Sequence, residues 1–421
     1  MDYIHRDRYL KKITDRMHNG MVKIVTGPRR SGKSWLLSHI FTDYLLAQGV
    51  DESQIVLISF DLDDENNQSE LLDPKALKEY LYGRISDKEK AYYVMLDEVQ
   101  DVPGFERIVN GLAAKENVDV YVTGSNSRYL SSDINTIFRG RGDEIRVWPL
   151  CFAEFVEGRH EPIAELWKEY YTYGGMPALR AMHTAEQKAV YLGRLWKKVY
   201  LTDVVERNRV QHAAALEALT DVLCSSIGSL NNPSKLSKTL QSVQQVKINS
   251  ETVDVYTNHL VNAYLFEGAR RYNIKGKKYF ESIQKYYCVD VGLRNARLNF
   301  RQQEITHIME NVIYNELRAR GFLVDVGVVE IRETDGGKQS QRQYEVDFVA
   351  TNGLERYYFQ SAYRLDSEEK REQELKSLRK IDDSFRKIVI VGDDIAPYID
   401  EHGITHIGLF DFLLDKAVAP W

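Results

Sequence analysis

A chain of 421 residues is long enough for two or three domains of about 150 residues each, which excludes a single small module. Hydrophobic residues make up 43% and charged residues 28%, with 26 Gly and 9 Pro, so the composition excludes a disordered or fibrous protein. The formal net charge of −6 excludes a protein that coats nucleic acid through a general cationic excess. Any nucleic-acid contact must therefore be a local patch.

Cysteine usage and the N-terminus predict the compartment. Cys151, Cys224 and Cys288 lie far apart in the sequence and form no CxxC pair, so neither a disulfide framework nor a zinc site is expected. Residues 1–8 are charged where a signal peptide would be apolar, and no apolar run approaches the roughly 20 residues of a membrane span. These features predict a cytoplasmic protein without a membrane partner.

The first third of the chain alternates short β-rich runs with helical stretches, a pattern typical of a parallel sheet covered by helices. The expected strands are Val22–Val25, Ile55–Phe60, Tyr92–Leu96, Val118–Val122 and Ile145–Val147. Ligand-binding loops emerge from the carboxyl edge of such sheets. The turns that follow the first four runs are therefore the places to look for a site.

A phosphate-binding loop is expected directly after the first strand. Residues 27–34, GPRRSGKS, fit GxxxxGK[ST] and precede an apolar helical stretch, so the loop would wrap phosphate oxygens with main-chain N–H groups. Lys33 would reach the β- and γ-phosphates, and the Ser34 hydroxyl would ligate Mg²⁺. The predicted nucleotide-binding residues are Gly27, Pro28, Arg29, Arg30, Ser31, Gly32, Lys33, Ser34 and Trp35.

A pair of carboxylates at the end of the third strand supports this interpretation. Tyr92–Leu96 is an apolar run followed by Asp97 and Glu98, which is the form of a Walker B element. Asp97 would hold Mg²⁺ through water, and Glu98 would polarise the attacking water as the catalytic base. The two elements together predict nucleotide hydrolysis rather than a solvated turn.

Two later segments offer further catalytic candidates. The fourth strand is followed by small polar residues, of which Asn126 is predicted to orient water near the γ-phosphate; a helix N-cap role is an equally open alternative. Arg139 and Arg141 precede the fifth strand. Either could act as an arginine finger, in cis or toward a neighbouring subunit, although a surface arginine pair explains the sequence as well.

The rest of the chain divides into three further predicted parts. Helical spacing dominates 152–209, which predicts a small helical lid after the core at 1–151. Three helical patterns and two β-rich runs over 210–298 predict a winged helix, and 299–421 predicts a second α/β domain. Within that last domain, the polar stretch Glu333–Arg342 is expected to be a solvated hairpin loop.

Taken in order, these motifs resemble a prokaryotic family of AAA-type ATPases with an AAA_14/DUF4143 architecture. The resemblance also rests on residues 149–155 (PLCFAEF), 173–177 (YGGMP) and 345–348 (EVDF), and it covers nearly the whole chain. It implies ATP as the nucleotide and an AAA-like core with the sheet order 5-1-4-3-2. It also implies a helical and winged-helix middle and a C-terminal domain similar to PD-(D/E)xK nucleases.

The C-terminal domain departs from a working nuclease of that kind. Asp347 and the helix residue Glu316 could stand for two acids of the site, but Gln360-Ser361-Ala362 stands where the resemblance requires ExK. One metal ligand and the water-activating cation are thus absent from those positions. We expect a degenerate domain that is used for binding or assembly and has no cleavage activity.

Charge weakens, but does not remove, the expectation of DNA binding by the winged helix. Its third helix, about 250–265, contains Glu251 and Asp254 and no Lys or Arg. The following hairpin carries a basic cluster, with possible additions from the preceding helix: Arg270, Arg271, Lys275, Lys277, Lys278, Lys235 and Lys238. A solvated wing is the competing explanation.

The leading prediction is a Mg²⁺-dependent ATPase that binds ATP and ADP and uses turnover to drive a conformational switch. One alternative is an interaction protein that holds nucleotide as a conformational ligand. Another is a DNA-binding ATPase that uses the basic wing. A protein partner and a homo-oligomer both remain open.

Overall fold

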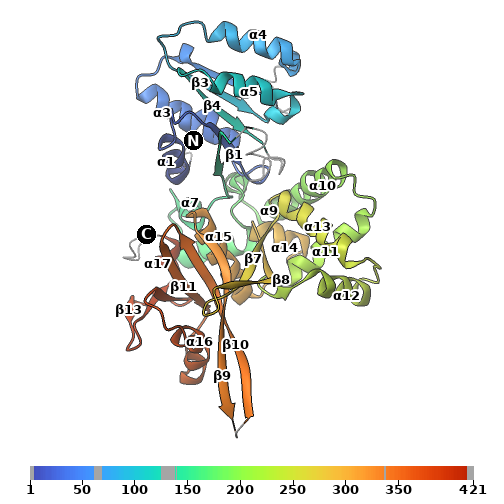
Figure 1. Ribbon diagram of the computed structural model, residues 1–421, viewed down its shortest axis with the longest axis vertical. Helices are drawn as coiled ribbons and strands as arrows, with labels where there is room; N and C mark the ends of the chain where they lie inside the picture. The colour runs from blue at the N-terminus through green and yellow to red at the C-terminus, as the bar shows by residue number, and fades with distance from the viewer. Residues whose placement is uncertain (1–3, 61–68, 125–137, 139, 336–337, 415–421) are drawn as a thin grey trace. The chain divides into compact units, whose positions relative to one another are not determined.

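The structure is a computed structural model that describes residues 4–60, 69–124, 138, 140–335 and 338–414. The chain forms two compact units (Figure 1). The first comprises residues 1–149 with 262–264, and the second comprises 150–261 with 265–421. Every helix in the described part of the chain is too short or too polar to cross a bilayer.

The first unit is built on a five-stranded sheet with the order β2-β3-β4-β1-β5. All of its strand pairs are parallel, and the order confirms the 5-1-4-3-2 arrangement expected from the resemblance. The strands are β1 (Val22–Thr26), β2 (Ile55–Ser59), β3 (Tyr92–Asp97), β4 (Val118–Thr123) and β5 (Gly142–Arg146). Each expected strand is therefore present, with ends shifted by one to three residues.

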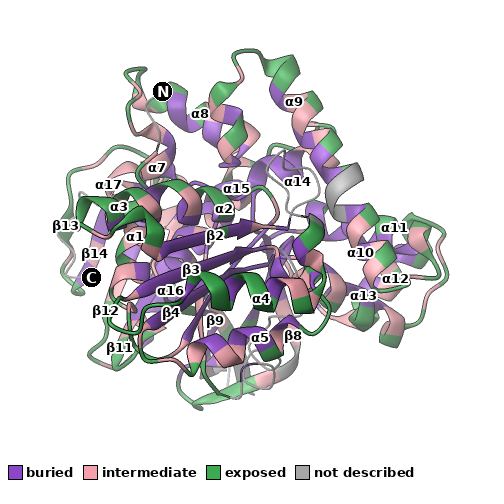
Figure 2. Cartoon of the chain, turned by 90° about the horizontal axis from the view of Figure 1, so that it is seen from above, coloured by how far each residue is buried: buried purple, intermediate pink, exposed green. Residues whose placement is uncertain are grey.

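Helices cover both faces of this sheet because its central strands are apolar on both sides. One face packs against α4 (Pro74–Arg84) and α5 (Phe105–Ala113) through a continuous hydrophobic core. The other face lies under α1 (Asp7–Thr14) and the helix that runs through α2 (Lys33–Trp35), a π-helical segment (Leu36–Phe41) and α3 (Thr42–Ala47). Figure 2 shows β3 and β4 as buried and the outer faces of α3 and α4 as exposed.

The second unit begins with helices and continues into a nine-stranded sheet. Its first helices are α7 (Phe152–Val156), α8 (Ile163–Tyr173), α9 (Ala185–Arg194), a π-helical segment (Leu195–Leu201) and α10 (Thr202–Arg207). There follow α11 (Ala213–Ser225), β6 (Leu230–Asn231), α12 (Pro233–Val243), α13 (Ser250–Asn262), β7 (Phe266–Asn273), β8 (Lys278–Cys288) and α14 (Val291–Arg297).

The C-terminal part completes the nine-stranded sheet, whose order is β13-β14-β12-β11-β10-β9-β7-β8-β6. It comprises α15 (Ile305–Ala319), β9 (Leu323–Asp335), β10 (Lys338–Asn352), β11 (Glu355–Ala362), α16 (Glu368–Arg379), β12 (Arg386–Val391), β13 (Tyr398–Ile399), β14 (Ile404–Gly408) and α17 (Leu409–Leu413). Tyr314 of α15 stacks on Tyr287 of β8 at 4.2 Å between ring centroids. On the other face, Leu375 and Leu378 of α16 join the core.

One prediction about this part was wrong, and two observations bear on the predicted boundaries. The described residues of the polar stretch 333–342 are strand rather than loop, because β9 runs to Asp335 and β10 starts at Lys338. The two strands pair as far as Leu323 and Thr351, with a register shift between Val346 and Val349. The boundaries predicted near residues 209 and 298 do not separate compact units. The strand β7 pairs with β9 as well as with β8, so the predicted wing and the C-terminal domain share one sheet.

A tight backbone crossing lies between the YGGMP sequence at 173–177 and the start of α14. A Cβ atom on Gly292 would lie 1.7 Å from the carbonyl oxygen of Tyr173, so this position requires glycine. The buried Asp290 carboxylate accepts hydrogen bonds from the N–H groups of Gly175 (2.7 Å) and Leu293 (2.9 Å). Burial raises the pKa of Asp290 to about 6. The crossing thus fixes the end of α8 against the start of α14.

Candidate nucleotide-binding site

The loop after β1 has the backbone of a phosphate-binding loop. Gly27 has φ +135° and Gly32 has φ +93°, values that L side chains rarely adopt, and Arg30 is also left-handed at φ +63°. A Cβ atom on Gly27 would lie 2.1 Å from the carbonyl oxygen of Val147, so the loop packs directly against the segment after β5. The loop then enters α2 at Lys33, where the first N–H groups of the helix have no intrahelical partner.

Lys33 lies inside the loop rather than in solvent. Its Nζ donates hydrogen bonds to the carbonyl oxygens of Gly27 (3.1 Å) and Pro28 (2.9 Å), and the side chain is 4% exposed. Burial lowers the pKa of Lys33, while the carboxylates of Glu98 and Asp97 oppose that shift. An ammonium held by two main-chain carbonyls can exchange those bonds for stronger, charge-assisted bonds to an incoming phosphate.

Three oxygen-bearing side chains meet at the carboxyl edge of the sheet. The Ser34 hydroxyl donates to Asp97 Oδ1 at 3.0 Å, and the Thr123 hydroxyl also donates to the Asp97 carboxylate. Burial raises the pKa of Asp97, and the bonds from Thr123 and Ser34 partly offset this. Hydroxyl and carboxylate oxygens are the ligands that Mg²⁺ prefers, so Ser34 and Asp97 fit the predicted metal position.

Glu98 follows Asp97 with a left-handed backbone, φ +52°. Its N–H donates to the Thr123 hydroxyl at 2.9 Å, and its carboxylate accepts a hydrogen bond from the Gln100 amide. The turn therefore holds Glu98 at the same sheet edge as Lys33 while leaving it half-buried. Such a backbone outlier next to a motif is typical of a functional position.

A buried hydroxyl in the loop supports a ligand at this place. Ser31 is fully buried, and its Oγ has no hydrogen-bond partner among the residues that the structure describes. Leaving such a group unsatisfied is costly, and a phosphate oxygen would satisfy it. Together with the glycine backbone and the Lys33 ammonium, Ser31 makes the loop fit the polyphosphate of a nucleotide.

The remaining predicted loop residues surround this centre. Pro28 is buried, Arg29 is half-buried and Arg30 is exposed. Arg29 acts on Lys33 electrostatically and contributes to its lowered pKa, after the larger effect of burial. Trp35 is 48% exposed and stacks on His39 at 3.7 Å between ring centroids, one helical turn further on.

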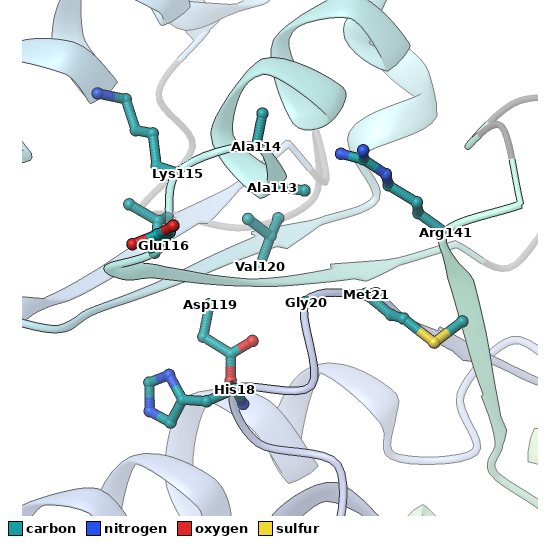
Figure 3. Close-up of a pocket in the computed structure, with 11 residues that line it drawn as sticks. His18, Gly20, Met21, Ala113, Ala114, Lys115, Glu116, Asp119, Val120 and Arg141 are labelled. Carbon is teal, nitrogen blue, oxygen red and sulfur yellow. Dashed lines mark hydrogen bonds between the residues drawn. The ribbon is translucent and has the colours of Figure 1, made fainter.

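The structure does not bring Arg141 to the phosphate-binding loop. It precedes β5, and its carbonyl accepts the Val22 N–H at the start of β1, so it lies at the amino edge of the sheet. There it lines a cleft of about 500 Å³ with His18, Met21 and Lys115 (Figure 3). A role for Arg141 in cis is thus unsupported by its position. Arg139 and Asn126 lie outside the described residues.

Thr123 is a site residue to which the sequence analysis assigned no role of its own. Its hydroxyl contacts both Asp97 and the Glu98 backbone, so it connects the ends of β3 and β4. The signal was available in the sequence: Thr123 is the hydroxyl residue that opens the polar run after the fourth strand, from which Asn126 was chosen instead. Neighbouring parallel strands end at the same edge, which makes such a contact predictable.

A second polar cluster lies in the second unit, on the sheet beneath α15. Lys285 of β8 is buried, and its Nζ lies 2.9 Å from Glu310 Oε1, 2.8 Å from Glu345 Oε1 and 4.0 Å from Asp347 Oδ1. The Tyr287 hydroxyl also donates to Glu310 at 2.7 Å. Burial lowers the pKa of Lys285, but the three carboxylates outweigh this and raise it.

This cluster corrects one prediction about the nuclease-like residues. The helix acid beside Asp347 is Glu310, whereas Glu316 pairs with Arg320 at 2.7 Å within α15. The Gln360 side chain accepts from the Asp347 N–H at 3.4 Å and donates to Glu374 at 3.2 Å. Burial and the neighbouring Glu310 raise the pKa of Asp347 to about 8. The cation of this cluster comes from β8 and not from the position of Ala362.

Comparison with known proteins agrees with the geometry of the first unit. Residues 19–156 match a family described as an AAA domain, which spans β1 to β5 and both carboxylates. The chain is 31% identical over 416 residues to an uncharacterized protein of Haemophilus influenzae, and the match covers 98% of each chain. The chain belongs to the same family as this Haemophilus protein, and its residues 19–156 carry an AAA domain.

Three other matches cover different shares of the chain. An uncharacterized protein of Methanocaldococcus jannaschii is 27% identical over 409 residues, 93% of this chain and 86% of that one. Among solved structures, a Walker-type ATPase of Pyrococcus abyssi is similar at 15% identity and a TM-score of 0.49, covering 70% of this chain and 96% of that chain. Residues 164–304 match a domain of unknown function, DUF8612, whereas the resemblance had implied DUF4143 for residues 299–421.

Proposed function

We propose that the first unit binds Mg·ATP and hydrolyses it, and that turnover switches the conformation of the chain. The observation that supports this most directly is the contact of Ser34 with Asp97 at 3.0 Å, beside a glycine-rich loop that buries Lys33. A phosphate-binding loop alone would support binding only. The added carboxylate pair at the end of β3 supports hydrolysis.

The roles of the residues follow from their positions. Main-chain N–H groups of the loop and the Ser31 hydroxyl hold the β-phosphate, while Lys33 leaves the Gly27 and Pro28 carbonyls for the β- and γ-phosphates. Ser34 and Asp97 hold Mg²⁺, which when bound neutralises developing charge on the phosphoryl oxygens. Thr123 keeps the Asp97 carboxylate turned toward this position.

Glu98 acts as the base in this proposal. The Gln100 amide and the Thr123 hydroxyl fix its side chain and its backbone, which orients the carboxylate before water arrives. Asn126 and Arg139 keep their predicted roles as water-orienting residue and arginine finger. Arg141 could act only toward a neighbouring subunit, because it lies at the amino edge of its own sheet.

For the second unit we propose a binding or assembly role without cleavage. The order α11, β6, α12, α13, β7, β8 supports a winged helix, with β6 and β7 on either side of β8. The cluster of Glu310, Asp347 and Gln360 supports a nuclease-like ancestry. Lys285 is paired with two carboxylates there, so the ammonium neutralises the acids that would otherwise hold a cation.

The contacts of the basic residues speak against the DNA-binding alternative. Lys275 pairs with Asp382 at 2.9 Å, and Arg271 is 8% exposed and bonds Gln343. Arg270 stacks over the Tyr279 ring at 4.1 Å. Val253, Tyr256 and Leu260 of α13 are buried, so this face of the helix packs in the core. The wing is thus held in the sheet and its cations are partly engaged.

The test is ATP turnover by the full chain in Mg²⁺, alone and with duplex DNA, single-stranded DNA or RNA. Glu98→Gln should bind ATP as the wild type does and hydrolyse it about 100-fold more slowly, because the base is removed. Equal turnover in both proteins would refute Glu98 as the base. Negligible turnover with tight binding, under every condition, would favour the nucleotide-gated interaction protein. Stimulation by duplex DNA would revive the DNA-binding alternative.

A further inference from the structure

Arg6 is a buried arginine outside the motifs of the nucleotide site. It precedes α1, has a left-handed backbone with φ +53° and is 6% exposed. Burying a guanidinium is costly unless it makes hydrogen bonds, and a left-handed arginine adds backbone strain. We therefore expect Arg6 to make contacts that offset both the burial and the backbone strain.

The guanidinium bridges two segments of the first unit. Nη1 donates to the carbonyl oxygen of Ser31 in the phosphate-binding loop at 3.1 Å, and Nη2 donates to the carbonyl oxygen of Trp148 at 2.7 Å. The guanidinium also lies 4.5 Å from the centroid of the Tyr9 ring. The Tyr9 hydroxyl accepts the Trp148 N–H at 3.1 Å, so both polar groups of the Trp148 backbone are engaged by this segment.

The segment that Arg6 grips also supports the other end of the loop. Val147 donates its N–H to Thr26 at 2.8 Å, and its carbonyl oxygen is the atom that a Cβ on Gly27 would meet. Residues 147–148 thus contact the first glycine of the loop directly and reach Ser31 through Arg6. We call the two hydrogen bonds of Arg6, to Ser31 and to Trp148, the brace of the loop.

Peptide geometry gives this brace a consequence for phosphate binding. In a trans peptide the C=O of one residue and the N–H of the next point in opposite directions. With the Ser31 carbonyl held by Arg6, the Gly32 N–H is turned away from Arg6. The same peptide precedes the first residue of α2, where free N–H groups receive an anion.

We propose that Arg6 is a positioning residue of the nucleotide site: by gripping the Ser31 carbonyl, it holds the Ser31–Gly32 peptide in the orientation that presents the Gly32 N–H to the phosphates of ATP. The inference rests on the proposed function of the loop. Arg6 itself touches neither phosphate nor metal. Because Arg6 orders this peptide before the nucleotide arrives, the loop loses less conformational entropy when the nucleotide binds.

The experiment compares Arg6→Ala, Arg6→Lys and a matched control, Arg16→Ala. Arg16 follows the same helix and pairs with Asp143 at 3.0 Å, at the amino edge of the sheet. For each full-length protein, the dissociation constant of Mg·ATP is measured by calorimetry below the melting temperature, together with kcat, KM and the melting temperature.

Arg6→Ala should raise the dissociation constant and KM about tenfold and change kcat less, because the loop holds the phosphates in both the ground state and the transition state. Arg6→Lys should recover only part of the lost affinity. An ammonium can still donate to a carbonyl, but it lacks the planar fork that reaches two carbonyls at once. Arg16→Ala should bind ATP as the wild type does.

Three outcomes would overturn the proposal. Unchanged ATP affinity in Arg6→Ala, or in Arg6→Lys where the alanine variant does not fold, removes the positioning role and leaves the nucleotide site intact. An equal loss of affinity in Arg16→Ala assigns the effect to general destabilisation. A wild-type chain that binds no Mg·ATP removes the proposed function, and the role of Arg6 with it.

Discussion

Two of the charged clusters among the residues that the structure describes, one in each unit, differ in what their buried lysine contacts. At the carboxyl edge of the five-stranded sheet, Lys33 bonds only main-chain carbonyls and the buried Ser31 hydroxyl has no partner among the described residues. In the nine-stranded sheet, Lys285 lies within 2.9 Å of two carboxylates. The first cluster keeps groups available for an anion, whereas the second uses its cation internally.

This difference teaches how a binding site can be told from a structural ion cluster when neither holds a ligand. A buried ammonium that is matched by carboxylates gains little from a ligand, because its charge is already compensated. A buried ammonium held by neutral carbonyls can exchange those bonds for stronger ones to phosphate. The number and charge of the partners, rather than burial alone, separate the two cases.

The largest expected effect is that of Lys33→Ala on nucleotide binding. Removing the ammonium deletes charge-assisted bonds to two phosphates and should weaken Mg·ATP binding by about a thousandfold. The measurement is a titration with a fluorescent ATP analogue, with circular dichroism as the check on folding. Lys115→Ala, at the amino edge of the same sheet, is the control and should bind normally. Wild-type affinity in Lys33→Ala would contradict the comparison.

Lys285→Ala should reduce the stability of the protein and leave nucleotide binding intact, the reverse of Lys33→Ala. Removing Lys285 leaves the mostly buried Glu310 and the partly exposed Glu345 without their cation, so the second unit should lose up to about 3 kcal/mol of stability in urea unfolding, the low end of the range for a broken buried pair. Nucleotide affinity should stay unchanged. Lys275→Ala is the control, because its pair with Asp382 is exposed and should contribute less than about 1 kcal/mol. A loss in Lys285→Ala as small as in the control would show that the cluster is not structural.

The smallest effect concerns pH and Mg²⁺. Because burial raises the pKa of Asp97, protons should begin to compete with Mg²⁺ at a higher pH than for an ordinary aspartate, and affinity should fall as pH falls. Thr123→Val removes a hydrogen bond that lowers this pKa, so the fall should shift to higher pH, with Mg²⁺ affinity about fivefold lower at pH 7. The measurement is Mg²⁺ titration of the ADP complex from pH 5 to 8.

Thr42→Val supplies the control for that experiment. It makes the same change at a hydroxyl that bonds the Leu37 carbonyl within its helix. Its pH profile should match that of the wild type. Coincident profiles for Thr123→Val and wild type would show that the hydroxyl does not govern the metal position.

The sequence predicted the parts of the site that follow from local patterns. The loop, Lys33, Ser34, Asp97 and Glu98 each follow a buried strand in a known spacing, and parallel strands bring their ends to one edge. The position of Arg141 was also decidable, because a residue that precedes a parallel strand lies at the opposite edge from one that follows it.

Other features depended on contacts that no local pattern encodes. Arg6 bonds residues 25 and 142 positions away, and Lys285 meets a later helix, α15, and a later strand, β10. The choice of Glu310 over Glu316 depends on which face of α15 meets the sheet, and both residues are buried or nearly so. The parallel pairing of β7 with β9 joins strands whose own sequences indicate only that each is a strand.

That pairing affects how the second unit can be divided. The backbone of β7 is hydrogen-bonded to β8 on one side and, over Arg271–Asn273, to β9 on the other. Cutting the chain near residue 298 would expose an unpaired strand edge on each fragment. Such an edge can pair with strands of other protein molecules. Each half of this unit therefore covers a strand edge of the other half, and that edge would otherwise be prone to aggregation.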